Sequence, residues 1–190
     1  MKYFKRQEEP EFLQQNAARW NQQWAALKSR NPGATFNWYQ YKGQPVNQLL
    51  LPFLKLQSQN HCAYCDAFPL QIGDDTIDHF CPKSVPDYFM EAYSWRNLYC
   101  ACNHCQTAKM ESFSTDLLRP DAPDYSFERY FLYNYASHEI EVNPNASLTD
   151  QNKAETTIRI FQFNYPERTN HLKKACLGAL DKTICTGERT

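Results

Sequence analysis

The sequence predicts an α+β fold in which a small ββα centre is wrapped by amino-terminal and carboxy-terminal helices. Three observations predict this class: two C-x2-C pairs in the middle of the chain, short strand-like runs between them, and helical spacing of apolar residues towards both ends. The 190 residues suit a single domain. We expect a helical arm over residues 1–59, the ββα core over 60–112, and a hairpin with further helices over 113–190.

Composition and charge exclude several classes of protein. The chain holds 12 Phe, 12 Tyr and 4 Trp against 5 Gly, which excludes low-complexity and collagen-like sequences. Its net charge is −1, but residues 74–150 contain five Lys or Arg against thirteen Asp or Glu. This acidic middle argues against a protein that binds nucleic acid unaided, because such proteins present a basic face to phosphates.

Neither a signal peptide nor a membrane anchor is expected. The basic start of the chain is followed by QEEP at residues 7–10, where a signal peptide needs an apolar core. The longest apolar stretch, residues 49–54, is far shorter than the roughly 20 residues that cross a bilayer, and Pro52 interrupts it. We therefore expect a soluble, cytoplasmic protein with no membrane partner.

Helical spacing predicts two helices in the amino-terminal arm. Large apolar side chains recur at near-helical intervals over residues 11–30, with Pro10 at the start and the sequence NPG at 31–33 as a stop signal. A second apolar segment, residues 46–56, is expected to be helical despite Pro52 and leads towards the first cysteine pair.

The predicted core consists of two short strands and one helix. Residues 76–80 have the composition of a strand, and the apolar run at 95–99 is expected to form the second. Residues 103–110 lack Gly and Pro, which favours a helix there.

A hairpin and two more helices are expected after the core. Within residues 129–142 two apolar runs flank a polar turn, a pattern typical of a hairpin. Ser147 or Thr149 is suited to cap a helix that runs through Phe161. A last helix is expected to begin at Pro166, because proline is favoured in the first helical turn.

The cysteines indicate a metal site. In a reducing compartment, thiols are better explained as metal ligands than as disulfides. Four thiolates in two pairs suit tetrahedral zinc with no open position, which is a structural site. The proposed Zn²⁺ ligands are Cys62, Cys65, Cys102 and Cys105. The sequence leaves open whether Cys100 or Cys81 replaces one of these ligands. His61 is a weaker alternative.

An Asp-His pair lies between the two cysteine pairs. A neutral imidazole suits a general base near pH 7, so His79 is the candidate base. Asp78 is the candidate ligand of a hard divalent ion, Mg²⁺ or Mn²⁺, that would offset charge at a phosphate. Side chains alternate along a strand, so a bend or bulge is needed for both to serve one site. The alternative is a capping Asp78 and a packing His79.

These motifs resemble the zinc-bearing branch of the HNH endonuclease family. The resemblance implies a ββα-metal fold with a catalytic Asp-His strand, a later Asn and a short helix, held together by four cysteines. The residues that carry it are CAYC (62–65), IDHF (77–80), NLYCACNHC (97–105) and QTAK (106–109).

The resemblance also implies roles for further residues. Asn97 matches the Asn that orients the loop and the catalytic His. Gln106 stands directly after the last cysteine, where relatives commonly carry the Asn that serves as second metal ligand, and we expect it to bind the ion. His104 would lie on nearly the opposite side of the helix. Lys83 and Lys109 are candidate phosphate contacts, although solvated lysines are the commoner explanation.

A second set of residues carries a narrower resemblance: HFCPKS (79–84), WRNL (95–98) and the opening Y-x-K-x3-E-P (3–10). This resemblance is to the HNH subunit of Septu-type antiphage systems, which also occurs attached to retrons. It implies a nuclease subunit partnered by a PtuA-like ABC-type ATPase that supplies nucleic-acid binding and regulation. Where a retron is attached, its reverse transcriptase and RNA–DNA hybrid would be partners too.

Two other functions compete with the nuclease. One is a catalytically idle zinc module that braces or recruits a defence partner, and the other is a zinc-stabilised nucleic-acid binder without cleavage. The acidic middle counts against the binder. The choice between DNA and RNA, including transfer RNA, stays open because such centres contact phosphate and sugar more than base edges. The cleavage sequence, trigger and stoichiometry stay open too.

Overall fold

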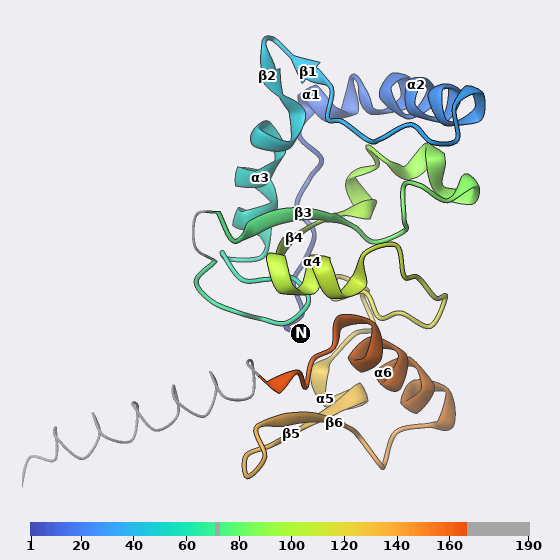
Figure 1. The fold of residues 1–190 in the computed structure, drawn as a ribbon. Coiled ribbons are helices and arrows are strands. Elements are labelled where there is room, and N and C mark those ends of the chain that lie inside the picture. The colour runs from blue at the N-terminus through green and yellow to red at the C-terminus, as the bar shows by residue number, and fades with distance from the viewer. Residues whose placement is uncertain (71–72, 167–190) are drawn as a thin grey trace, which may run out of the picture.

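The computed structural model describes residues 1–70 and 73–166, and in them it has a mixed helical and small-sheet architecture (Figure 1). The α-helices are α1 (Glu11–Gln14), α2 (Ala17–Arg30), α3 (Val46–Gln57), α4 (Asn103–Lys109), α5 (Phe127–Tyr130) and α6 (Leu148–Phe161). Two 3-10 helices, η1 (Pro86–Glu91) and η2 (Trp95–Asn97), precede β4. The helix expected from Pro166 onward falls almost entirely outside the described residues.

The strands form three separate antiparallel pairs among the described residues. These pairs are β1 (Gln40–Tyr41) with β2 (Gln44–Pro45), β3 (Asp75–His79) with β4 (Leu98–Cys102), and β5 (Phe131–Asn134) with β6 (Glu139–Val142). The predicted hairpin at 129–142 is confirmed by the third pair.

The amino-terminal arm differs from its prediction in one respect. The single helix expected over residues 11–30 is divided into α1 and α2 at Asn16. Asn16 departs from helical geometry, and its side-chain amide donates to the carbonyl of Phe12 at 2.7 Å. A side chain that bonds the preceding turn competes with the regular helix, which explains the break. The helix at 46–56 is confirmed as α3, with Pro52 on its exposed side.

The centre of the molecule is the β3–β4 pair with α4. In the pairing register Asp78 lies opposite Tyr99 and His79 opposite Leu98, and the register runs without interruption from Asp75 to His79. All five residues of β4 are buried. Helix α4 follows β4 directly, because Cys102 caps it: the thiol accepts from the amide of Cys105.

The second predicted strand of this centre was misplaced. Residues 95–97 form the 3-10 turn η2, and the strand is Leu98–Cys102 instead of 95–99. The reason is Asn97, whose buried side chain bonds to backbone groups outside the sheet and holds the chain in a turn. Apolar character at Trp95 reflects burial in the core and not sheet pairing.

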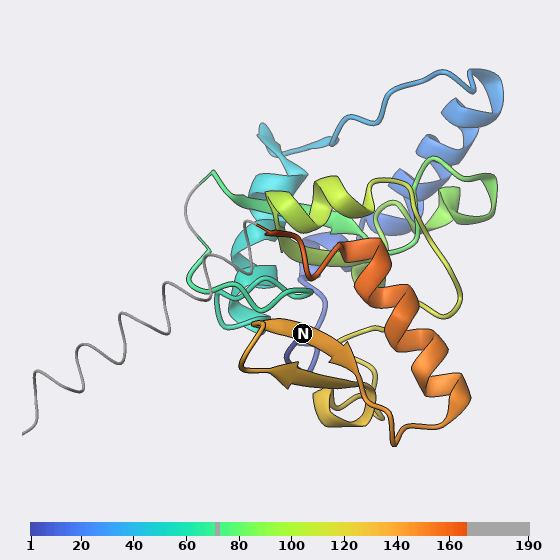
Figure 2. The ribbon, with the colours of Figure 1, turned by 60° about the horizontal axis from the view of Figure 1, so that its bottom comes forward.

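The carboxy-terminal part packs under this centre. Figure 2 shows α6 running below α4, with the β5–β6 hairpin and α5 beneath. Ser147 caps α6, since its hydroxyl accepts from the amide of Asp150 at 3.1 Å, so Thr149 is not the cap. At the other end of α6, Phe161 stacks on Tyr64 with ring centroids 4.1 Å apart.

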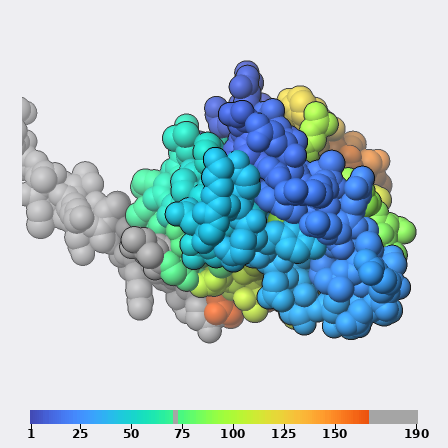
Figure 3. All heavy atoms as spheres, turned by 90° about the horizontal axis from the view of Figure 1, so that it is seen from above, coloured from blue at the N-terminus to red at the C-terminus, as the bar shows by residue number. Residues whose placement is uncertain are grey.

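The amino-terminal arm covers another face. Seen from above, α1, α2, α3 and the segment between α2 and β1 form the blue and cyan surface in Figure 3. The side chains of Trp20 and Trp24 are buried under this surface. None of the helices in residues 1–70 and 73–166 has the length and apolar character that crossing a membrane requires.

Candidate metal centre and Asp-His site

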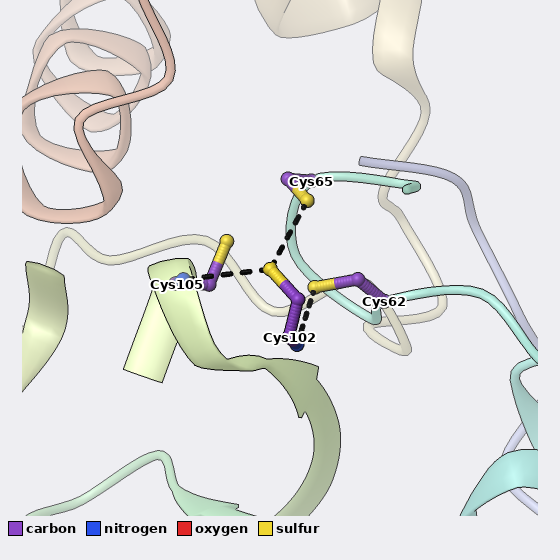
Figure 4. A group of neighbouring side chains, drawn as sticks. All are labelled: Cys62, Cys65, Cys102 and Cys105. Atoms are coloured by element: carbon purple, nitrogen blue, oxygen red, sulfur yellow. Dashed lines mark hydrogen bonds between the residues drawn. The ribbon is translucent and has the colours of Figure 1, made fainter. Parts of the chain in front are cut away.

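Four cysteines converge at one buried point. Cys62 and Cys65 lie on the loop after α3 (the first knuckle, residues 62–65), and Cys102 and Cys105 lie at the junction of β4 and α4 (the second knuckle, residues 102–105), as Figure 4 shows. Their sulfur atoms all lie within 4.8 Å of one another, and those of Cys65 and Cys102 are 3.7 Å apart.

This geometry fits a structural zinc ion. Zn–S bonds of about 2.3 Å in a tetrahedron place the sulfur atoms about 3.8 Å apart. Backbone amides also point at the sulfurs: the Cys102 amide donates to the Cys62 thiol at 3.3 Å. Burial raises the pKa of the Cys62 thiol well above its usual range, so a cation is needed to hold thiolates here. All six cysteines in the described residues are free of disulfides.

The alternative ligands lie elsewhere. The Cys100 thiol is buried outside the group of four, and burial raises its pKa to about 12. The Cys81 thiol faces Arg119, whose guanidinium lies 3.7 Å from the sulfur. His61 pairs with Asp66 at 2.7 Å. The described geometry therefore favours the two C-x2-C pairs as the metal ligands.

His79 ends β3 and is held by one backbone carbonyl. Its Nε2 lies 2.9 Å from the carbonyl oxygen of Ala92. A carbonyl oxygen only accepts, so Nε2 carries the proton, and in the neutral ring the lone pair is on Nδ1. Burial, assisted by the charge of Lys83, lowers the pKa of His79 well below its usual range. The ring is thus a neutral histidine with a defined tautomer.

Aromatic side chains from the amino-terminal arm cover His79. The Trp38 ring stacks on the imidazole with centroids 5.4 Å apart, and Phe36 meets it edge-on at 5.2 Å. Both belong to the segment between α2 and β1, which lies on the face seen in Figure 3. Only 5% of the His79 surface is exposed. We name residues 34–39 the aromatic cover.

The side chain of Asp78 contacts residues of the first knuckle and of α4. Its Oδ2 accepts a hydrogen bond from the Tyr64 hydroxyl at 2.8 Å and lies 3.3 Å from the ammonium of Lys109. Burial raises the pKa of this carboxyl, although Lys109 and Tyr64 oppose the shift. No bulge interrupts β3, so the bend expected between Asp78 and His79 is absent there. Lys109 contacts both residues, since its ammonium also donates to the His79 carbonyl at 2.6 Å.

Asn97 connects the two segments that hold His79. Its Oδ1 accepts from the amide of Cys81 at 2.7 Å, and its Nδ2 donates to the carbonyls of Cys81 and Glu91 at 3.0 and 2.9 Å. Cys81 lies two residues after His79, and Glu91 lies one residue before Ala92. One buried amide therefore fixes the distance between the histidine and the carbonyl that orients it.

Helix α4 brings two further candidates to β3. Gln106 donates from Nε2 to the carbonyl of Ile77 at 3.2 Å, next to Asp78. Lys109 follows one turn later on the same side, while the His104 ring stacks on Tyr165 at 4.4 Å. Lys109 is completely buried, so in this structure it faces the Asp78 carboxylate and offers no surface to a phosphate.

Lys83, unlike Lys109, borders open space. Its ammonium lies 5.2 Å from the centre of the Phe36 ring, on the edge of the aromatic cover. It lines a surface pocket of about 310 Å³ together with Phe36, Lys28 and Glu111. Phe36 thus both lines this pocket and meets the His79 ring.

Comparison with known proteins gives one informative resemblance. No protein-family model matches the chain. The chain is similar to the Septu protein PtuB of Bacillus mycoides (strain KBAB4), with 24% identity over 156 residues that cover 70% of this chain and 52% of the relative. The chain thus spans about half the length of PtuB. The similarity confirms the resemblance to a Septu protein expected from the sequence motifs.

Sequence reasoning missed several residues around the site. The hydroxyl of Tyr64 reaches Asp78 from within the first knuckle, and Phe36 and Trp38 reach His79 from the arm. The sequence FNWY at residues 36–39 was a signal, because three aromatics in a segment without strand or helix spacing need a surface to pack on.

Proposed function

We propose that this chain is a metal-dependent HNH endonuclease that hydrolyses nucleic-acid phosphodiester bonds as the effector subunit of a Septu-type antiphage complex. We infer that β3, β4 and α4 form its ββα-metal centre. The observation that carries the proposal is the orientation of His79, whose Nε2 is 2.9 Å from the Ala92 carbonyl. Its strand also carries the buried Asp78 and pairs with β4, which ends at Cys102 of the cysteine cluster. The similarity to PtuB supports the defence role.

In this mechanism His79 is the general base. With its proton on Nε2, the neutral ring has its lone pair on Nδ1, which takes a proton from the attacking water. Its depressed pKa keeps the ring unprotonated at neutral pH. Asn97 is a positioning residue, because its three hydrogen bonds hold the segments that carry His79 and Ala92.

Asp78 and Gln106 are the proposed ligands of the catalytic ion. Carboxylate and amide oxygens are the donors that Mg²⁺ and Mn²⁺ prefer, and such an ion would stabilise negative charge on the phosphate and the leaving oxygen. The donor set fits: both neighbours of Asp78 engage Oδ2, which leaves Oδ1, and Gln106 uses its Nε2 on Ile77, which leaves its amide oxygen. Lys109 holds Asp78 from the buried side.

Phosphate recognition falls to Lys83 in this proposal. Its ammonium borders the pocket of about 310 Å³, where it can meet a backbone phosphate, whereas Lys109 is enclosed. Residues 74–150 carry thirteen acids against five bases, so the chain needs help to hold nucleic acid. We propose that a PtuA-like ABC-type ATPase supplies binding and control, with DNA or RNA, transfer RNA included, as substrate. Association with a retron reverse transcriptase and its RNA–DNA hybrid is a further proposal.

One observation favours a second candidate, a catalytically idle zinc module that braces a partner. His79 is 5% exposed under the aromatic cover, and Asp78 is 4% exposed and paired with Lys109. Side chains that only pack in a protein core would also be buried and paired in this way. The nuclease is preferred because the three hydrogen bonds of Asn97 fix the His79 and Ala92 segments relative to one another more precisely than packing of His79 would require.

A cleavage assay separates the two. The chain, purified with the proposed PtuA-like ATPase, is incubated with plasmid DNA and with transfer RNA, with Mn²⁺ or with a chelator. We expect cleavage that needs the divalent ion and falls by about 10²–10⁴ in His79→Ala, since that is what loss of a general base costs. His138→Ala, in the β5–β6 hairpin, is the matched control. Equal rates in the His79 variant and the wild type would favour the idle module.

A further inference from the structure

Tyr64 connects the cysteine cluster to the Asp78 carboxylate. It lies between Cys62 and Cys65 in the first knuckle, and its side chain is completely buried. Its hydroxyl donates to Asp78 Oδ2 at 2.8 Å. The loop of Figure 4 that carries two of the four sulfurs therefore also carries a donor to the proposed catalytic carboxylate.

We propose that Tyr64 is a positioning residue that fixes the Asp78 carboxylate for binding of the divalent ion. This inference rests on the proposed function. Through Tyr64, the structural metal site determines where the catalytic carboxylate stands, so the two metal sites are mechanically coupled.

The Tyr64 ring has little freedom to move its hydroxyl. Phe161 of α6 stacks on it at 4.1 Å with planes inclined by 25°, and Tyr99 of β4 packs at 5.5 Å. Asp78 lies opposite Tyr99 in the sheet register, so ring and carboxylate are fixed by the same strand pair. A donor held this firmly selects one carboxylate orientation before any ion binds.

The two donors of Asp78 engage the same carboxylate oxygen. Tyr64 and Lys109 both approach Oδ2, from the first knuckle and from α4. Oδ1 is then the oxygen available to an ion, and rotation of the carboxylate would lose both contacts. Removing the Tyr64 hydroxyl leaves Lys109 as the main donor, which pulls the carboxylate towards the buried ammonium and away from an ion.

The test compares two hydroxyl deletions in the full chain. Tyr64→Phe removes the donor to Asp78, and Tyr99→Phe removes a neighbouring hydroxyl that donates to Asp121 instead. Mn²⁺ binding is measured without nucleic acid, from the electron paramagnetic resonance signal of free Mn²⁺. Zinc content and the thermal midpoint are measured on the same samples.

We expect Tyr64→Phe to bind Mn²⁺ about tenfold more weakly or worse, because a buried hydrogen bond to a charged group has been lost. Its zinc content should equal that of the wild type, and Tyr99→Phe should bind Mn²⁺ as the wild type does. Unchanged Mn²⁺ affinity in Tyr64→Phe overturns the inference, and so does equal weakening in Tyr99→Phe, which indicates general loosening.

A second variant tests the positioning without deleting the hydroxyl. Phe161→Leu removes the ring stacked on Tyr64 and should weaken Mn²⁺ binding with zinc retained. Wild-type affinity in this variant as well as in Tyr64→Phe excludes positioning through Tyr64. Failure of the proposed function has a different signature. In that case the wild type binds no Mn²⁺, or Asp78→Asn binds Mn²⁺ as tightly as the wild type does. The Tyr64 inference would then fail as well.

Discussion

The indole of Trp38 stacks on the imidazole of His79, with centroids 5.4 Å apart and planes inclined by 21°. The two residues are 41 positions apart, and the contact brings the amino-terminal arm onto the last residue of β3. With His79 5% exposed, a phosphate and a water cannot both reach the ring. In the mechanism proposed above, the aromatic cover must therefore move before His79 can act, and the described conformation would be a resting one.

Removing the cover should raise the activity of the isolated chain. We expect Trp38→Ala to increase its cleavage rate with Mn²⁺ severalfold, because access to His79 no longer requires displacement of the stacked ring. Rates on plasmid DNA and transfer RNA measure this, and Tyr135→Ala, an exposed aromatic of the hairpin, is the control. A slower Trp38→Ala enzyme with an unchanged thermal midpoint would mean that Trp38 serves the substrate instead.

Elements defined by local pattern were predictable from the sequence. Helix α3, strand β3, helix α4 and the β5–β6 hairpin follow from apolar spacing and turn residues, which act over a few positions. The break at Asn16 and the turn at Asn97 were missed because side-chain bonds to the backbone decided them. Such bonds depend on neighbours that a periodic pattern does not contain.

The candidate site divides in the same way. The convergence of the four cysteines was predictable because C-x2-C spacing is set by the geometry of metal coordination. The partners of Asp78 and His79 were not, because Tyr64, Lys109 and Trp38 reach them through tertiary packing. Sequence could name Lys109 as a basic residue near the motif, but only the fold places its ammonium inside the protein.

Loss of one zinc ligand should unfold the centre. Zinc binding to closed thiolate sites contributes on the order of 10 kcal/mol to folding in small domains, so Cys105→Ser should lower the thermal midpoint strongly and lose the metal. Elemental analysis and thermal unfolding measure both effects. Cys100→Ser, a buried thiol outside the cluster, should keep the zinc. Well-folded wild-type protein without zinc would contradict this assignment.

Gln106 should affect the metal requirement more than the fold. Its amide donates to the Ile77 carbonyl beside Asp78, and its oxygen is the proposed ligand, so Gln106→Ala should raise the Mn²⁺ concentration for half-maximal cleavage. His104→Ala should leave that concentration unchanged, because its ring stacks on Tyr165 instead. A change in this Mn²⁺ concentration in His104→Ala but not in Gln106→Ala would contradict the prediction.

Acidic pH should weaken the ion pair between Arg129 of α5 and Asp150 of α6. Helix α6 also carries Phe161, which stacks on Tyr64. A hydrogen bond from Arg129 lowers the pKa of Asp150 below its ordinary value of 3.8. A carboxyl with a depressed folded pKa stabilises the fold above its unfolded pKa, and that contribution is lost as pH falls through the folded value. Asp150→Asn should therefore be less stable than the wild type by a constant amount above about pH 4, with the gap narrowing in more acidic solution. Urea unfolding at several pH values measures the difference in stability between the two proteins. A difference that increased on acidification would exclude the Asp150 carboxylate as its origin.

The charge distribution leads to a prediction about partners. Residues 74–150 hold thirteen acids and five bases, so the surface around β3, β4 and α4 should repel phosphate unless another protein offsets it. We expect the isolated chain to bind nucleic acid weakly, and its co-expression with the proposed PtuA-like ATPase to give a stable complex that holds nucleic acid more tightly. Fluorescence anisotropy at several salt concentrations measures the binding, and co-purification tests the complex. Because phosphate contacts release counterions, tight binding by the isolated chain that weakens steeply with salt would contradict the need for a partner. Failure to co-purify would contradict the partner itself.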